Sequence, residues 1–418
     1  MKGRTTMGVE ILSLEEYSEY VYNCAQRSFM QTPEMAELLK KRGYTVEFVG
    51  LRNGENRLTN AAILYSKPMT GGLHMEINSG PVSSDTRYLR PFYNNLRYHS
   101  KRKGALELII KPYDDYHQLD NDGYQLIDPQ EEYIIALTTL DYKFDGLQTG
   151  YPGGEPDWHY VKEMSEISQE ELLDTFTKNG KATVKKANTF GIKLKKLNRD
   201  ELHIFKEATA ATSDRREYTD KPLDYYQDFY DAFGDKAEFM AATLNFKDYL
   251  HNLERDKAKL EQQLTILTDR YSNNPDSAKF HRQTKELNHQ IDTFNTRISE
   301  AHGFIQKYGD QDQVLAVSLF VYTRQEVTYL FSGSYPEFNK FYAPALLQEY
   351  GMREAIRRRI PLYNFLGIMG VFDGSDSVLR FKQNFNGYIV RKTGTFRYYP
   401  NPIKYKAIQL IKKILRRS

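Results

Sequence analysis

The 418-residue sequence contains a single cysteine, Cys24, and a single tryptophan. One cysteine cannot form a disulfide within the chain, so the composition fits a reducing cytoplasm. No uninterrupted apolar run reaches the length of a membrane-spanning helix. The first residues, MKGRTTMGVEIL, lack the apolar core of a signal peptide. We exclude residues 1–6 from the fold analysis because the segment before Met7 resembles an expression remnant.

Metal-binding patterns are also missing. The nine histidines are scattered, and no His-x-x-x-His or Cys-x-x-Cys pair occurs, so we expect no metal. Neither a P-loop nor a Gly-x-Ser-x-Gly or Gly-x-Gly-x-x-Gly motif is present. The segment GYPGGEPDW is rich in glycine, but its prolines and acids fit a turn better than a phosphate cradle. The sequence therefore favours chemistry without a bound cofactor.

The remaining composition is that of an ordinary globular protein. Hydrophobic residues make up 40% and charged residues 27%, and the length predicts two or three domains. The net charge of +3 says little about partners, so local clusters have to identify them. The 32 tyrosines suit a cleft for polar, extended substrates, although most of them fit tyrosine-rich strands equally well.

Strand and helix patterns predict two α+β domains of similar design, residues 7–160 and 161–418. In the first domain, strands are expected over Thr45–Arg52, Asn60–Pro68, Leu73–Val82 and Ala105–Tyr113, and near Ile134 and Tyr160. In the second, strands are expected over Ile192–Leu197, Ala237–Phe246, Val314–Thr323, Glu326–Ser334 and Leu362–Ile368. Helical patterns lie between these strands in both halves.

An interruption in the second domain predicts an antiparallel coiled-coil hairpin over residues 247–308. Apolar positions recur at steps of three and four, break at SNNPDS and then resume. They are Leu250, Leu253, Leu260, Leu264, Leu267 and Tyr271, and then Phe280, Leu287, Ile291, Phe294, Ile298, Ala301 and Ile305. Because the hairpin lies between two strands, we expect it to project as an arm that contacts a partner and takes no part in catalysis.

Basic stretches stand out against the nearly neutral total. KNGKATVKKANTFGIKLKK carries seven lysines between Lys178 and Lys196, and REAIRRR covers Arg353–Arg359. Such surfaces favour phosphates, although a solvated helix face is the commoner meaning of a charge run. The segment Thr212–Tyr230 combines arginines with tyrosines that suit a diphosphate and a sugar, or it is only a surface loop.

The C-terminal segment KYKAIQLIKKILRRS places Ile408, Ile411 and Leu415 near one face of a helix, with basic residues elsewhere. A basic amphipathic helix can lie on an anionic membrane surface. A terminal helix packed on its own domain explains the same pattern, and both alternatives stay open.

The order of these parts resembles the Fem family of peptidoglycan branching aminoacyltransferases, and within it the MurM and MurN branch, MurN most of all. The resemblance covers most of the chain. It is carried by SFMQTPEMAELLKKRGY, INSGPV, TSDRREYTDKPLDYY, YLFSGSYPEFNKFYAPALLQEYGMREA, YNFLGI and LRFKQNFNGYIVRKTGTF, together with the arm. It implies two GNAT-like acyltransferase domains with the hairpin inserted in the second.

The resemblance also implies a reaction. An amino acid, alanine by the likeness to MurN, moves from aminoacyl-tRNA to an amine on the peptide of a lipid-linked cell-wall precursor. Aminoacyl-tRNA is then a co-substrate, no dissociable cofactor is needed, and the enzyme acts in the cytoplasm at the inner face of the membrane. Lys382, which follows Phe381 in RFKQNF, matches the family lysine that stabilises the oxyanion formed when an amine attacks an ester.

Further site residues follow from the same resemblance. Precursor binding is expected from Lys40, Lys41, Arg215, Arg216, Lys221 and Tyr225. Binding of tRNA is expected from the basic helix, at Lys178, Lys181, Lys185 and Lys186. Two positions depart from the family pattern, because Lys111 replaces an aspartate and Ser79 replaces an arginine. An aspartate cannot be the general base at position 111 here.

Two alternatives remain beside aminoacyl transfer. The chain could be a non-catalytic protein that binds RNA or a partner through the arm and the basic patches. It could also be a Fem-like immunity factor that alters the composition of the bridge to block a lytic enzyme. Fold-level analogy favours transfer, since a scaffold has little use for the cleft or for Lys382.

Overall fold

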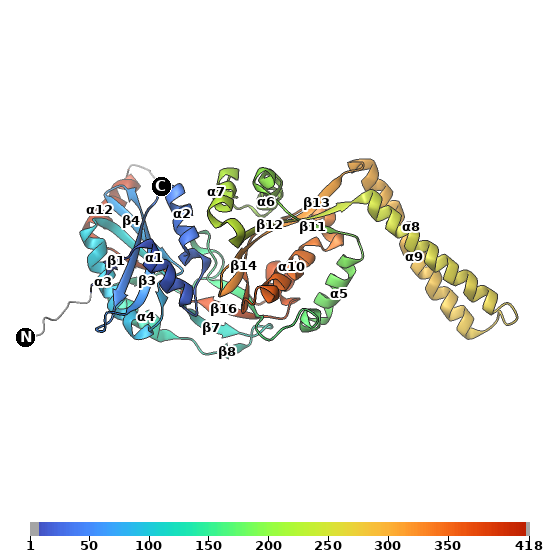
Figure 1. The fold of residues 1–418 in the computed structure, drawn as a ribbon, viewed down its shortest axis with the longest axis horizontal. Coiled ribbons are helices and arrows are strands. Elements are labelled where there is room, and N and C mark those ends of the chain that lie inside the picture. The colour runs from blue at the N-terminus through green and yellow to red at the C-terminus, as the bar shows by residue number, and fades with distance from the viewer. Residues whose placement is uncertain (1–7, 415–418) are drawn as a thin grey trace, which may run out of the picture.

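Residues 8–414, which the computed structural model describes, form two mixed β-sheets with helices on both faces of each (Figure 1). The first sheet has the order β1 (Glu10–Ile11), β2 (Thr45–Arg52), β3 (Leu58–Met69), β4 (Gly72–Asn78), β6 (Ala105–Lys111), β17 (Phe396–Tyr398) and β9 (Lys143–Phe144), with β5 (Val82–Ser83) paired to β3. The second has the order β11 (Lys193–Lys196), β12 (Ala237–Asn245), β13 (Asp312–Tyr322), β14 (Glu326–Ser334), β15 (Leu362–Ile368), β10 (Trp158–Glu163), β16 (Tyr388–Lys392), β7 (Asp115–Leu119) and β8 (Gln125–Ile127).

The sheets exchange strands across the middle of the sequence. β7 and β8 precede residue 160 but belong to the second sheet, and β17 near the C-terminus belongs to the first. The predicted division into residues 7–160 and 161–418 therefore follows the order of the chain, whereas the sheets take strands from both sides of it. Among the described strands, each sheet contains one parallel pair, β4 with β6 and β14 with β15.

Helices cover each sheet according to the alternation of apolar side chains. In β4, Met75 and Ile77 face the cluster formed with α3 (Leu89–Arg102) and α4 (Glu131–Thr138). On the other face, α1 (Leu14–Asn23) and α2 (Pro33–Lys41) pack on β2 and β3. The second sheet lies between α5 (Lys178–Asn188) with α10 (Ala343–Arg357) and α6 (Leu202–Arg216) with α7 (Leu223–Phe233).

Helix α2 belongs to the cores of both domains. Ala36 packs with the first sheet, whereas Met35 and Leu38 join the core cluster of α6 and α7. Thr32 caps the helix by accepting a hydrogen bond from the Met35 amide, and Pro33 occupies its first turn. Its C-terminal cations are thereby held at the junction between the domains, next to α7 (Figure 1).

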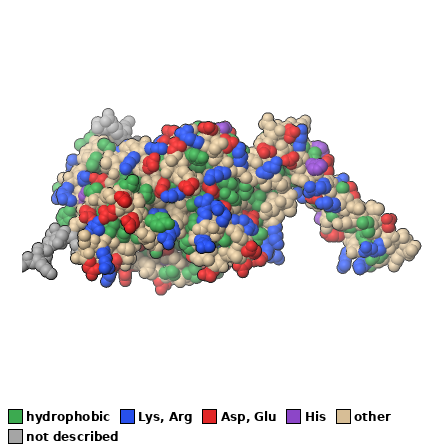
Figure 2. Space-filling model, viewed as in Figure 1, with side chains coloured by type: hydrophobic (Ala, Val, Ile, Leu, Met, Phe, Trp, Pro, Cys, Tyr) green, Lys and Arg blue, Asp and Glu red, His purple; other side chains and the backbone are tan. Residues whose placement is uncertain are grey.

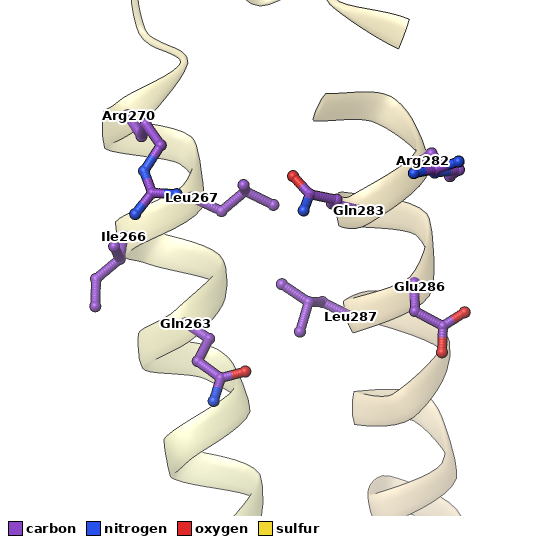
Figure 3. A pocket seen from close by; sticks show the side chains of 8 residues that line it. All are labelled: Gln263, Ile266, Leu267, Arg270, Arg282, Gln283, Glu286 and Leu287. Atoms are coloured by element: carbon purple, nitrogen blue, oxygen red, sulfur yellow. The ribbon is translucent and has the colours of Figure 1, made fainter. Parts of the chain in front are cut away.

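The arm is confirmed as a helical hairpin. α8 (Phe246–Arg270) and α9 (Ala278–Tyr308) leave the sheet between the neighbouring strands β12 and β13 and project away from the body (Figure 1). Near the tip, the heptad residues Leu267 and Leu287 point toward each other between the helices (Figure 3). At the base, Tyr249 and Ala301 are buried in the core of the second domain.

One element was predicted wrongly. The strand expected near Ile134 is helix α4, which begins with Glu131 and Glu132. Acidic residues in the first turn stabilise the positive end of a helix, and the buried Leu137 anchors α4 in the cluster of α3. The strand expected over Leu73–Val82 is divided into β4 and β5, and the strand expected near Tyr160 in the first domain is β10 of the second sheet. The remaining predicted strands are confirmed, as is the α+β class. Within residues 8–414, no helix has the length and apolar character needed to cross a bilayer.

Because only its base packs on the body, the outer arm can be removed without loss of stability. We predict that replacing residues 258–291 with a short Gly-Ser linker leaves the melting temperature within about 2 °C of the full chain. A longer replacement, of residues 249–308, removes Tyr249, Leu253 and Ala301 from the core. We expect it to lower the melting temperature by at least about 10 °C. Equal melting temperatures for the two deletions, measured by circular dichroism, would contradict this account of the arm.

Candidate active site

The parallel strands β14 and β15 separate partway along their length. They pair from Glu326 opposite Leu362 to Thr328 opposite Asn364, and within the described strands their register ends there. β14 continues beside β13, and β15 continues beside β10. Their carboxyl-terminal halves therefore diverge, and we call the region between them the β14–β15 wedge.

Lys382 lies at this wedge, on the short helix α11 (Ser377–Gln383), and is only 3% exposed. Its Nζ donates hydrogen bonds to three successive carbonyl oxygens of β15, those of Phe365 (2.7 Å), Leu366 (3.0 Å) and Gly367 (2.6 Å). Leu366 has a φ of 54°, in the left-handed region, where the chain departs from a regular strand. Lys382 is therefore a buried lysine and not a surface cation.

Opposing influences act on the charge of Lys382. Burial lowers its pKa, the carboxylate of Asp376 raises it and Arg216 lowers it, and together they bring the pKa to about 7. Three carbonyl acceptors match the three donors of an ammonium group, which favours the protonated form. The side chain is therefore placed to change its protonation near neutral pH.

Asp376 fixes the helix that carries this lysine. Its Oδ1 accepts hydrogen bonds from the amides of Val378 and Leu379, and its Oδ2 accepts one from the amide of Met369 at 2.9 Å. The residue is both the N-cap of α11 and a link to the end of β15. Phe381 packs edge-on against Phe385, with ring centroids 5.4 Å apart, and supports the helix from the core side.

Arg215 and Arg216 are brought to the same wedge. Nη1 of Arg215 donates to the carbonyl oxygen of Ser334, the last residue of β14, at 3.2 Å. Helix α6 can come this close because Gly333 has no side chain, since a Cβ there would lie 2.3 Å from the main chain of Ala208. Arg215 is thus bound to the end of β14, and Arg216 lies near enough to Lys382 to lower its pKa.

Sequence reasoning missed Tyr151, which packs at the end of β15. A Cβ on Gly367 would lie 2.7 Å from the ring of Tyr151, so the ring lies against one of the three residues whose carbonyl groups bind Lys382. Tyr151 belongs to the GYPGGEPDW segment, for which the sequence indicates only a turn. Its position depends on packing between distant segments, which no local pattern reveals.

The other predicted precursor-binding cations lie between α2 and α7. Lys41 approaches Asp231 at 4.0 Å, whereas Lys40 lies over the ring of Phe48 at 5.7 Å. Arg42, which sequence reasoning missed, pairs with Asp224 and Asp228 of α7, both at 3.3 Å. These pairs offset the positive charge at the end of α2 and dock it onto α7.

Tyr225 connects these cations to the wedge. The guanidinium of Arg42 lies 5.9 Å and the ammonium of Lys221 5.4 Å from its ring centroid. The same ring meets Phe331 of β14 edge-on, with centroids 6.2 Å apart. Burial raises the pKa of Tyr225 to about 12, so its hydroxyl stays neutral and can donate a hydrogen bond.

A polar pocket between the two sheets is lined by both residues that depart from the family pattern, Ser79 and Lys111. Its lining includes Ser79 and Lys111 from the first domain and Glu155, Asp157 and Lys392 from the segments that join it to the second. Nζ of Lys111 lies 2.8 Å from a carboxylate oxygen of Glu155. A carboxylate is therefore present beside position 111, contributed by a segment that sequence reasoning assigned no role.

The Glu155 carboxylate is held rigidly. The side-chain amide of Asn78 donates to both of its oxygens, at 2.9 and 3.0 Å. Lys111 in turn lies 3.1 Å from Glu76, whose pKa is about 2 because His74 and Lys111 hold it charged against the effect of burial. This alternation of charges spans β4, β6 and the interdomain segment.

The lysines expected to bind tRNA lie on α5, whose first turn packs on Asn384, just after the helix that carries Lys382. Lys178, Lys185 and Lys186 are exposed, while Lys181 pairs with Asp174. Lys186 lies 5.2 Å from the ring centroid of Tyr342. Basic side chains gather over α5, on the part of the body beside the arm (Figure 2). Among residues 8–414, no three His, Cys, Asp or Glu side chains come together as a metal site.

The family model described as the FemAB family matches residues 12–413. The chain belongs to the FemAB family. Aminoacyltransferase FemA of Staphylococcus epidermidis is 25% identical over 411 residues, which cover 96% of this chain and 98% of the relative. FemA of Staphylococcus aureus gives the same identity and coverage. The crystal structure of FemX superposes with a TM-score of 0.74 at 19% identity, over 96% of this chain and 100% of that one.

Membership confirms several predictions. The chain is an aminoacyltransferase and shares its fold with FemX, so the enzyme interpretation holds over the non-catalytic alternative. Members of the FemAB family add amino acids to peptidoglycan precursors. The roles of the individual residues and the special likeness to MurN stay predictions.

The buried position of Lys382 predicts a distinctive dependence of stability on pH. Between about pH 7 and 10.5 the unfolded chain keeps the proton that the folded chain has lost, so the free energy of unfolding rises with pH. We predict that the free energy of unfolding of the wild type, minus that of Lys382→Met, increases by up to about 1.4 kcal/mol per pH unit across this window. Urea denaturation at several pH values measures it.

The exposed Lys178→Met serves as the matched control and should give a difference that does not change with pH. If the difference in free energy of unfolding between the wild type and Lys382→Met does not change with pH either, the lysine keeps its proton in the folded protein. That result would contradict the prediction.

Proposed function

We propose that this protein transfers an amino acid, alanine by its resemblance to MurN, from aminoacyl-tRNA to an amine on the peptide branch of a lipid-linked peptidoglycan precursor. The product is the interpeptide bridge. One observation carries the proposal: the buried Lys382 binds three carbonyl groups at the end of β15, and Arg215, at the end of α6, binds the last residue of β14. The reaction needs an acyl site and an anion site, and these residues are our candidates for the two.

In the proposed step, the neutral amine of the acceptor attacks the ester carbonyl of aminoacyl-tRNA. A C–N bond forms, negative charge develops on the carbonyl oxygen, and the C–O bond to the ribose then breaks. The ribose oxygen takes up a proton as the amine loses one. The Lys382 ammonium stabilises the oxyanion by exchanging one carbonyl acceptor for the reacting oxygen, and Phe381 helps to position it.

The precursor would bind along the domain junction. Its diphosphate meets Arg215, Arg216 and Lys221, since guanidinium groups bind phosphate in a bidentate manner. The ring of Tyr225 offers a flat surface and a hydroxyl group for the sugar. Lys40 and Lys41 contribute from α2, where Lys41 would exchange its long contact with Asp231 for the ligand.

The tRNA would approach from the side of α5. Lys178, Lys181, Lys185 and Lys186 supply phosphate contacts on one helix, with the arm beside it. A lipid-linked acceptor and a tRNA donor meet only at the inner face of the cytoplasmic membrane, and we therefore propose a peripheral location there.

Transfer with purified components tests the function. The protein is incubated with a panel of labelled aminoacyl-tRNAs and with lipid-linked precursors that carry or lack a first bridge residue. We expect transfer of alanine to one of the precursors. The alternative of an immunity factor predicts instead that expression changes the bridge composition in cells and protects them against a lytic enzyme. Absence of transfer from every aminoacyl-tRNA would refute the proposal.

Lys382 variants test the assigned chemistry. We predict that Lys382→Met lowers the single-turnover rate at saturating substrates by a hundredfold or more. Lys382→Arg should recover only part of the rate, because the planar guanidinium has a different reach. Rates are divided by the folded fraction, since both variants also lose hydrogen bonds to β15. If Lys382→Met keeps the full rate at saturation, Lys382 has no role in catalysis. If that variant only raises the apparent KM for the precursor, Lys382 is a phosphate ligand.

Substitutions on α5 test the tRNA surface. We predict that the triple variant Lys178→Gln, Lys185→Gln and Lys186→Gln raises the apparent KM for aminoacyl-tRNA about tenfold or more and reduces its salt dependence. The apparent KM for the precursor should not change. Lys193→Gln with Lys195→Gln is the matched control, because those lysines pair with Asp248 and Glu201.

An equal effect of the control pair would show that α5 has no particular role. The deletion of residues 258–291 is assayed in the same experiment. An unchanged KM for aminoacyl-tRNA in that variant would exclude the outer arm from tRNA binding.

A further inference from the structure

Helix α12 (Pro402–Ile414) lies against the first domain by one defined face. The side chain of Ile408 fills the space over Gly71, where a Cβ would come within 2.1 Å of its Cδ1. The ring of Tyr405 packs on Tyr399, with centroids 4.0 Å apart. These two contacts fix which side of the helix faces inward.

The opposite side presents four large apolar residues to solvent. Ile403 is 82% exposed, Leu410 60%, Ile411 54% and Ile414 70%. At 100° per residue, Ile403, Leu410 and Ile414 fall within 40° of one another, and Ile411 lies at one edge of the same stripe. We call these four residues the α12 stripe. Within residues 8–414, no element of the chain covers it.

Sequence analysis assigned the apolar face differently. It grouped Ile408 with Ile411 and Leu415, but Ile408 turns inward and Leu415 lies outside the described residues. The exposed face also includes Ile403, in the first turn of the helix. Because Ile408 packs on Gly71, the side of α12 that carries Ile408 faces the domain and the side that carries the α12 stripe faces solvent.

Positive charge borders the α12 stripe. Lys404 lies on one flank, and Lys406 and Lys413 lie on the other, while the helix contains no acidic residue. None of these lysines forms an ion pair with any part of the chain that the structure describes. An apolar stripe with cationic flanks matches an interface where apolar chains lie below anionic groups.

We propose that the α12 stripe docks the first domain onto a bilayer that contains anionic phospholipid. The apolar residues insert at the level of the acyl boundary, and the lysines meet the headgroups. Charge complementarity favours this occupant over a protein groove, which would need no uniform surround of cations. The inference agrees with a lipid-linked acceptor, but its test contains no substrate and so can fail or succeed independently of the proposed function.

The test is co-sedimentation of the full chain with vesicles of phosphatidylcholine alone, or with 30% phosphatidylglycerol added. We expect binding to the anionic vesicles that is at least tenfold tighter than to the neutral ones and that weakens with salt. A stripe variant, Ile403→Ser, Leu410→Ser and Ile414→Ser, should bind at least tenfold more weakly. A charge variant, Lys404→Gln, Lys406→Gln and Lys413→Gln, should lose a similar amount.

The matched control is Leu126→Ser, Ile135→Ser and Leu147→Ser, three apolar residues that are 57%, 57% and 49% exposed elsewhere on the surface. It should bind like the wild type, and thermal unfolding checks that every variant folds. The proposal is overturned if the stripe variant binds like the wild type, if the control loses as much, or if neutral vesicles bind equally well.

Discussion

Three successive carbonyl groups at the end of β15 bind the ammonium of Lys382, and this interaction organises the site. β15 is irregular here, with a register shift against β10 and a left-handed Leu366, and a buried carbonyl acceptor without a donor is costly. The lysine satisfies them, and its own burial moves its pKa into the neutral range. The same contact thus satisfies these carbonyl groups and holds a titratable cation at the wedge.

The remaining parts of the site come from segments that are far apart in the sequence. α2 belongs to the cores of both domains, and its last cations meet α7 through ion pairs. Tyr225 at the start of α7 touches both those cations and β14. The interdomain segment adds Tyr151 over Gly367 and Glu155 beside Lys111. A ligand held at the junction therefore contacts both domains, which suits a reaction between two large substrates.

Positive charge is concentrated on particular helices, although the net charge of the chain is small. The chain has a net charge of only +3, yet α5 and α12 each present several lysines free of acidic neighbours on their own helix. Counterion release makes such local clusters effective for polyanions even on a nearly neutral protein. The arm, by contrast, carries both acidic and basic residues along its two helices and so presents no cluster of one sign.

Local pattern determined the class of this fold and much of its detail. The strands Thr45–Arg52, Glu326–Ser334 and Leu362–Ile368 have the predicted bounds, and the heptads predicted the hairpin, because periodicity and turn residues act over short stretches. Family motifs also pointed to Lys382, Arg215 and Arg216. The tertiary structure alone decided that α4 is a helix, that Ile408 faces inward, and that Arg42, Tyr151 and Glu155 join the site. Each of these depends on a contact between residues distant in sequence, and the energy of such a contact is absent from any local pattern.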